Sequence, residues 1–349
     1  MFCVAGLVLP TCTFAQGGIA DEIKSLHQVL DDLYKEMIPL CKKLIDVGRG
    51  IAGFAATWYI AYRVWGHIAR AESIDFYPLL RPFVLGFAIL NFNLVIDMIR
   101  FVMEPTVTGT SEMVQNSNQA VAQLLKMKED AIKQTNAWKM YVGASGTGDY
   151  DKWYQYNFPN DDQNWLQNIY NRVSFSAEKA MYNFRNSIKE WMSVALQIFF
   201  EAAALCINTI RTFYMIVLAI LGPLVFGLSV FDGFQNSLRS WLARYINIFL
   251  WLPVANIFGA VIGKIQENML KIDIGQIYKD GDTSFSATDA GYMVFMVIGI
   301  VGYFTVPTIA NYIVSVGHGG NVLGNKTIAY SRATMNTTSN LVQRLTGRK

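Results

Sequence analysis

Long apolar stretches constrain the fold of this chain more than any other feature. Each is near the roughly 20 residues that a helix needs to cross the hydrocarbon core of a bilayer. The clearest are residues 47–66, 82–102, 212–231, 241–263 and 291–316. Only 16% of all residues are charged, against roughly 25% in an ordinary soluble domain. The sequence therefore predicts an all-α, polytopic membrane protein with about five transmembrane helices.

A sixth stretch, residues 191–210, is apolar apart from a few polar side chains at helical spacing. With their flanking neighbours these are Glu190, Ser193, Gln197, Glu201, Asn208 and Arg211, here called the polar stripe. On a helix they fall within about 80° of one another. A carboxylate inside an apolar run is costly unless it faces protein or water. The polar stripe indicates either a pore or subunit interface, or a polar seam between packed helices.

The positions of Lys and Arg bear on the topology. If residues 186–211 form an embedded amphipathic helix that does not cross, five full spans place both Arg239 and the basic tail inside. Six spans would place them outside, which the positive-inside rule disfavours. Three lysines within residues 264–290 count mildly against five spans. We favour five, with the mature N-terminus outside and the C-terminus inside.

The sequence suggests six segments. Residues 1–15 are signal-like, with Thr13-Phe14-Ala15 fitting a cleavage site, although an uncleaved anchor is the alternative. Residues 16–46 carry a heptad seam, so we expect an amphipathic helix that lies on its own chain or against a second copy. The others are a first transmembrane hairpin (47–103), an outer helical and aromatic-rich loop (104–185), a C-terminal transmembrane bundle (186–316) and a basic flexible tail (317–349).

Two further pairs of residues stand out within the apolar stretches. Asp97 and Arg100 are three residues apart, so they can form an intramembrane polar pair on one helix face. Gly259 and Gly263 form a small-xxx-small pattern, which permits close helix packing.

The search for catalytic chemistry finds no signature. There is no GxxxxGK[ST] phosphate loop, and the three histidines are too scattered for a zinc set. We expect no catalytic residue, no bound metal and no cofactor, and therefore no enzyme.

Several extended blocks carry a family resemblance. They are "GRGIAGFAATWYIAYRVW", "FYPLLRPFVLGF", "YNFRNSIKEWM", "ILGPLVFGLSVFDGF" and "WLARYINIFLWLPVANIFGAVIGKIQENML". These blocks resemble the TraJ family of conjugative transposons, which is similar to the TrbL-type inner-membrane subunit of type IV secretion systems. The resemblance implies a periplasmic N-terminus and large loop, a cytoplasmic basic end, and a role in passing DNA with attached protein across the inner membrane.

The leading hypothesis is therefore a channel or scaffold subunit of a conjugation machine. Its expected partners are secretion ATPases, periplasmic core proteins, further copies of this chain, membrane lipid and, transiently, the transferred DNA. The rival is an ion-coupled secondary transporter that uses Asp97 and Glu201, although the chain shows no internal repeat. A bare assembly anchor is a third reading.

Overall fold

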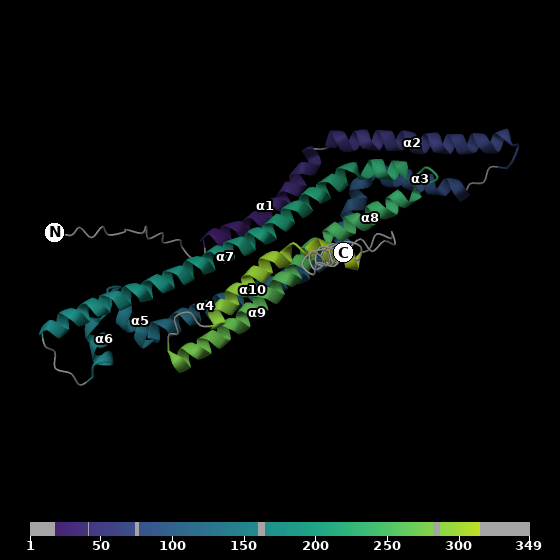
Figure 1. Ribbon diagram of the computed structural model, residues 1–349. Helices are drawn as coiled ribbons and strands as arrows, with labels where there is room; N and C mark the ends of the chain where they lie inside the picture. Colours follow the sequence, from purple (N-terminus) through teal and green to yellow (C-terminus); the bar gives the residue numbers. More distant parts are fainter. Residues whose placement is uncertain (1–17, 41, 74–76, 160–164, 282–286, 315–349) are drawn as a thin grey trace, which may run out of the picture. The chain divides into compact units, whose positions relative to one another are not determined.

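The computed structural model describes residues 18–314 except 41, 74–76, 160–164 and 282–286 (Figure 1). The described part contains helices and no strand, which confirms the all-α prediction. The helices are α1 (Gly18–Leu40), α2 (Lys42–Ala69), α3 (Tyr77–Leu90), α4 (Phe92–Gln134), α5 (Asn136–Tyr141), α6 (Tyr150–Asn157), α7 (Trp165–Leu228), α8 (Gln235–Phe249), α9 (Trp251–Asp280), α10 (Ala287–Tyr303) and α11 (Val306–Ile313). The signal-like segment and the basic tail lie outside the described residues.

Helix α7 is much longer than the sequence suggests. It runs unbroken for 64 residues, about 96 Å at 1.5 Å per residue, with Pro223 near its end. The stretch 186–211 and the apolar run after it therefore belong to one helix. The structure does not separate an embedded amphipathic helix from a following span, because no Gly or Pro interrupts the pattern between them.

Two pairs of helices meet at sharp bends. The axes of α3 and α4 differ by 84° at Asn91, and those of α10 and α11 differ by 55°. The Asn91 side chain donates a hydrogen bond to the Phe87 carbonyl oxygen at 3.1 Å, so it satisfies a carbonyl at the end of α3. The predicted span 82–102 is thus a bent pair. Beyond the bend, α4 continues as one helix to Gln134.

In the part of the chain that the structure describes, two to four helical stretches are long and apolar enough to cross a membrane, so the expected count of about five is not confirmed. Two helical stretches qualify, Trp165–Leu228 and Gln235–Lys279, and the number rises to four if each bent pair counts as one span. Helix α2, which holds the predicted span 47–66, is not among them. It nevertheless exposes apolar side chains along one face, namely Val47, Ile51, Phe54, Trp58, Tyr62 and Trp65. Such a stripe is typical of a surface that contacts lipid or another chain.

Helices α4, α9, α10 and α7 pack side by side over a long distance (Figure 1). Thr110, Ser117 and Lys128 of α4 contact Asn256, Ala260 and Asp273 of α9, respectively, so these two helices run parallel. Helix α10 runs antiparallel to α9, because Met296 contacts Gln266 and Tyr303 packs on Phe258. Aromatic rings such as Phe200, Phe258 and Tyr303 fill the space between them.

Helices α1 and α2 lie along α7. The Tyr34 and Tyr245 hydroxyls are 3.4 Å apart, which joins α1 to α8, and Ala52 of α2 packs against Gly227 of α7. Only part of the heptad seam is used in this packing. Leu30 is buried, whereas Leu26, Leu33, Leu40 and Leu44 are exposed.

A small aromatic core joins α5 and α6 to the start of α7. Trp153 is buried against Met140 and Phe175, and its Nε1 donates to Glu178 Oε2 at 2.8 Å. The Tyr141 hydroxyl donates to the same oxygen at 3.0 Å, and burial together with this contact raises the pKa of Tyr141. The aromatic side chains that remain exposed nearby include Tyr156, Phe158, Trp165 and Tyr170.

Candidate functional site

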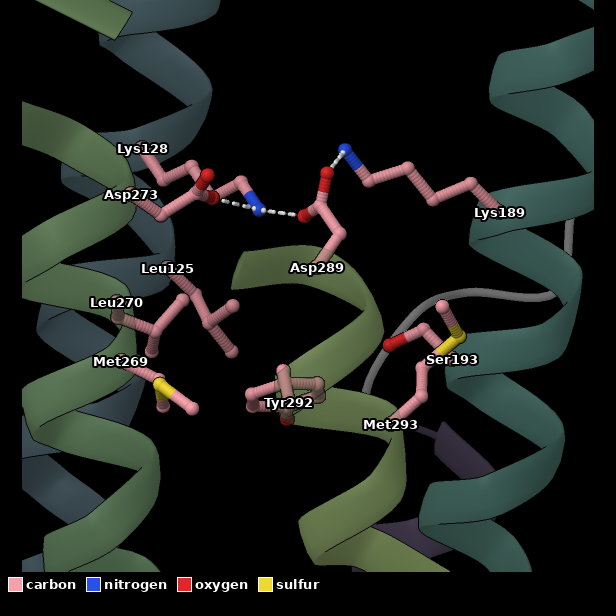
Figure 2. A pocket seen from close by; sticks show the side chains of 10 residues that line it. All are labelled: Leu125, Lys128, Lys189, Ser193, Met269, Leu270, Asp273, Asp289, Tyr292 and Met293. Carbon is pink, nitrogen blue, oxygen red and sulfur yellow. Dashed lines mark hydrogen bonds and ion pairs between the residues drawn. The ribbon is translucent and has the colours of Figure 1, made fainter. Parts of the chain in front are cut away.

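Four charged side chains from four helices meet inside the bundle, and Figure 2 shows them pointing toward one another. They are Lys128 of α4, Lys189 of α7, Asp273 of α9 and Asp289 of α10, here called the ion network. Lys128 Nζ lies 3.0 Å from Asp289 Oδ1 and also pairs with Asp273. Lys189 pairs with the other oxygen of Asp289. The side chains of Asp273 and Asp289 are only 7% and 6% exposed.

The position of Asp289 and the balance of charges explain why the ion network can be buried. Asp289 lies in the first turn of α10, where the helix dipole favours a negative charge. Two lysines balance two aspartates, so the buried charge sums to zero. Buried ion pairs gain little net stability, but removing one partner is strongly destabilising. The network therefore links α4, α7, α9 and α10 and favours one alignment of these helices along their lengths.

A cavity of about 60 Å³ adjoins the ion network. Its other lining residues are Leu125, Ser193, Met269, Leu270, Tyr292 and Met293 (Figure 2). This volume is large enough for water, and the lysine, aspartate and serine groups are suitable hydrogen-bonding partners. In the described residues, no group of three or more His, Cys, Asp or Glu side chains is placed to hold a metal ion.

The polar stripe on α7 reaches from this cavity to a second one. Ser193 lines the cavity beside the ion network, and Arg211 lines the second. Between them Glu201 is half-buried and interacts electrostatically with Tyr303 of α10. The Asn208 amide nitrogen lies 2.9 Å from His27 Nδ1 of α1, and Arg211 Nη1 donates to Asn208 Oδ1 at 3.3 Å.

The two ends of the stripe differ in exposure. Glu190 is exposed, Gln197 is half-buried, and Asn208 and Arg211 are buried. The stripe therefore changes from a surface feature to a seam with α1 along the length of α7.

The structure separates the other predicted polar residues. Asp97 is exposed, and Arg100 stacks over the Tyr34 ring at 4.8 Å; within the described residues no ion pair joins them. Arg100 shares the second cavity with Arg211, whereas Glu201 precedes Arg211 by about 15 Å along α7. The ion-coupling role of Asp97 and Glu201 stays a prediction.

Gly259 and Gly263 lie where α9 packs inside its own chain. A Cβ atom on Gly259 would meet the Tyr303 hydroxyl at 2.8 Å, and one on Gly263 would collide with the Ser117 side chain. Gly259 therefore packs against α10, and Gly263 packs against α4.

Sequence reasoning missed the ion network. Lys189 and Asp289 each lie just before an apolar run. Charged residues at such positions could have indicated an ion pair at the ends of packed helices. Their partners Lys128 and Asp273 lie in less apolar segments, and nothing in the spacing pairs residues 161 positions apart.

Comparison with protein families identifies the family of this chain. A family model described as homologues of TraJ from Bacteroides conjugative transposon matches residues 21–348, nearly the whole chain. No curated protein matches it.

Proposed function

We propose that this chain, which belongs to the family of TraJ homologues from Bacteroides conjugative transposons, is a channel or scaffold subunit in the inner membrane. Membership of this family indicates a role in conjugation, and the long apolar helices indicate membrane association. The proposed machine is a conjugative type IV secretion system that passes nucleoprotein across the inner membrane. The subunit itself carries out no enzymatic step.

One observation carries the channel proposal: helix α4 exposes a polar face, whereas the exposed side of α10 is apolar. Thr110, Ser117 and Lys128 point toward α9, and the opposite face of α4 is exposed to its full width. The exposed side chains there are Glu104, Thr108, Glu112, Gln115, Asn116, Gln119, Gln123 and Lys126. We call this set the α4 polar face.

The exposed side of α10 carries apolar side chains, whereas α9 exposes apolar side chains near its start and Lys264, Asn268 and Lys271 beyond them. The exposed apolar side chains are Ile257 and Val261 of α9 and Val294, Val297 and Val301 of α10. They lie level with the α4 polar face, because contacts align α9 with α4 and α10 with α9. A bundle with one polar and one apolar side suits a position between lipid and a water-filled path, since lipid excludes unsatisfied polar groups.

A single chain cannot enclose a path for a polymer. Several copies around a common axis would turn the α4 polar faces inward and the apolar faces of α10 toward lipid. The proposed partners are further copies of this chain, secretion ATPases on the cytoplasmic side and periplasmic core proteins. The N-terminus is periplasmic, the C-terminus cytoplasmic, and contact with DNA is transient.

Thiol labelling in intact inner-membrane vesicles tests this arrangement. In a background without native cysteines, Gln119→Cys should react with a membrane-impermeant maleimide. Val297→Cys is the matched control, and it should react only with a membrane-permeant reagent. Equal labelling of both positions by the impermeant reagent would place this length of the bundle in water and contradict the channel proposal.

Native mass spectrometry after gentle detergent extraction tests the ring. We expect a homo-oligomer of defined stoichiometry. A protein that is purely monomeric and still supports transfer would contradict the ring. It would favour a scaffold subunit that encloses no channel.

A further inference from the structure

The first half of α7 carries an apolar face that no described part of the chain covers. Its six bulky side chains, here called the α7 seam, are Leu166, Tyr170, Val173, Phe184, Ile188 and Trp191. They are between 41% and 72% exposed, although such side chains usually lie inside a protein. At 100° per residue all six fall within about 60° of one another, on the side of the helix opposite to Phe175 and Tyr182. A continuous exposed apolar face of this kind marks a binding surface.

The level of the α7 seam argues against lipid as its occupant. Helices α5 and α6 lie beside this part of α7 (Figure 1), since Tyr141 packs on Tyr182 and Trp153 packs on Phe175. At the same level these two short helices expose charged side chains, namely Lys139, Asp151 and Lys152. Exposed charges and irregular backbone avoid the hydrocarbon core of a bilayer. The seam therefore lies in water or against another protein chain.

The length of α7 supports this placement. Helix α7 has 64 residues, about 96 Å at 1.5 Å per residue, whereas the hydrocarbon core is roughly 30 Å thick. Much of the helix must therefore lie outside the core. The seam belongs to the half of α7 that precedes its most apolar stretch, residues 212–231.

The spacing within the seam favours a helix as the occupant. Leu166, Tyr170 and Val173 are separated by four and three residues, as in a heptad repeat. The group Phe184, Ile188 and Trp191 repeats this spacing 18 residues later, which is about five helical turns. Small side chains such as Ala177 lie between the two groups on the same face, so a second helix can approach closely there.

A second copy of this chain supplies a matching helix. Helix α7 is long and apolar enough to cross a membrane, and copies in one membrane have the same orientation. Their α7 helices therefore run parallel and present the same residues at the same level. Charge does not oppose this pairing, because every Lys, Arg and Glu between Leu166 and Trp191 lies about 90° or more from the middle of the seam.

The size of the seam is also sufficient for a stable contact. Three of its six side chains are aromatic, and a buried aromatic side chain covers roughly 150–250 Å². The seam is thus comparable to the roughly 800 Å² that each partner contributes to a standard interface.

We propose that the α7 seam binds the α7 seam of a second copy, so that the first halves of two α7 helices form a parallel pair outside the hydrocarbon core. This inference rests on the membrane position and the self-association in the proposed function, and it does not depend on a channel. Tyr170, Phe184 and Trp191 contribute most of the binding, since large aromatic side chains dominate interfaces.

Disulfide crosslinking of the full-length protein in inner-membrane vesicles tests the pair. In a background without native cysteines, single Val173→Cys and Phe184→Cys variants are oxidised with copper phenanthroline. Both should give covalent dimers, because each seam residue meets its own counterpart in a parallel pair. An antiparallel pair would give such a dimer only near the point where the helices cross.

Arg185→Cys is the matched control, because Arg185 is exposed and follows Phe184 directly but lies about 100° around the helix. Its yield of covalent dimer should be about tenfold lower. A second variant adds Phe184→Lys to Val173→Cys, which places like charges opposite one another and should lower the yield at Val173 by about tenfold or more. Phe184 is exposed in the single chain, so the fold should tolerate the change, and thermal unfolding checks this.

Yields at Val173 and Phe184 no higher than that at Arg185 would overturn the proposal, whether lipid or a different protein covers the seam. Native mass spectrometry measures the self-association of the proposed function separately. An oligomer by mass without these crosslinks would overturn only the α7 pair, whereas a monomer would contradict the ring as well.

Discussion

Asp289 of α10 and Lys128 of α4 are 161 positions apart in the chain, yet the carboxylate oxygen and the ammonium nitrogen lie 3.0 Å from one another inside the bundle. The other oxygen of Asp289 pairs with Lys189 of α7. One carboxylate thereby fixes α10 against two helices that come much earlier in the sequence.

The first prediction concerns this carboxylate. Asp289→Asn leaves Lys189 without its charged partner and Lys128 with only Asp273, so the free energy of unfolding should fall by about 3–5 kcal/mol. Thermal unfolding of detergent-purified protein measures it. Asp32→Asn is the control, because Asp32 pairs with Lys35 on the surface at 66% exposure and should change stability by about 0–1 kcal/mol. Equal unfolding temperatures for the two variants would show that the ion network does not stabilise the packing of the four helices.

The second prediction concerns the contact between α2 and α7. A Cβ atom on Gly227 would lie 2.5 Å from the Cα atom of Ala52, so Gly227→Ala should push the helices apart and lower the unfolding temperature. Gly53→Ala, on the same α2 helix, meets nothing within 4 Å and should stabilise slightly through helix propensity. Adding Ala52→Gly to Gly227→Ala should restore part of the loss. Destabilisation by Gly53→Ala of the same size would contradict this account.

The third prediction concerns Glu201, midway along the polar stripe. Glu201→Gln keeps the shape of the side chain and one acceptor oxygen but removes its charge, so the protein should insert normally while transfer falls. Conjugation frequency, normalised to the amount of membrane-inserted protein, is the measurement. Phe199, which is exposed, and Ala203, which is buried, serve as packing controls on other faces of α7. Unchanged normalised transfer would mean that the stripe is a structural seam.

The fourth prediction concerns the sidedness of the basic tail. Lys326, Arg332, Arg344, Arg348 and Lys349 carry positive charge with no acidic residue among residues 317–349, so the positive-inside rule places the tail in the cytoplasm. Cysteines introduced there should be protected from an impermeant thiol reagent in intact cells and become reactive after permeabilisation. Labelling in intact cells would reverse the proposed orientation.

The sequence by itself determined that the chain is all-α and rich in membrane-length apolar stretches. Both properties are local, because apolar run length and helical periodicity need no partner to be read. It also placed Ser193, Glu201 and Arg211 on one face of one helix, since they fall within about 80° of one another at 100° per residue.

Only the tertiary structure decided what those residues meet. Asp97 and Arg100 have the right spacing to pair, yet Arg100 turns to Tyr34 because α1 packs there. The spacing of Gly259 and Gly263 predicts close helix packing. In the structure they pack against Tyr303 and Ser117 of the same chain. The ion network and the second cavity arise where distant helices meet. The burial and the charge state of a side chain are set by those neighbours rather than by its place in the sequence.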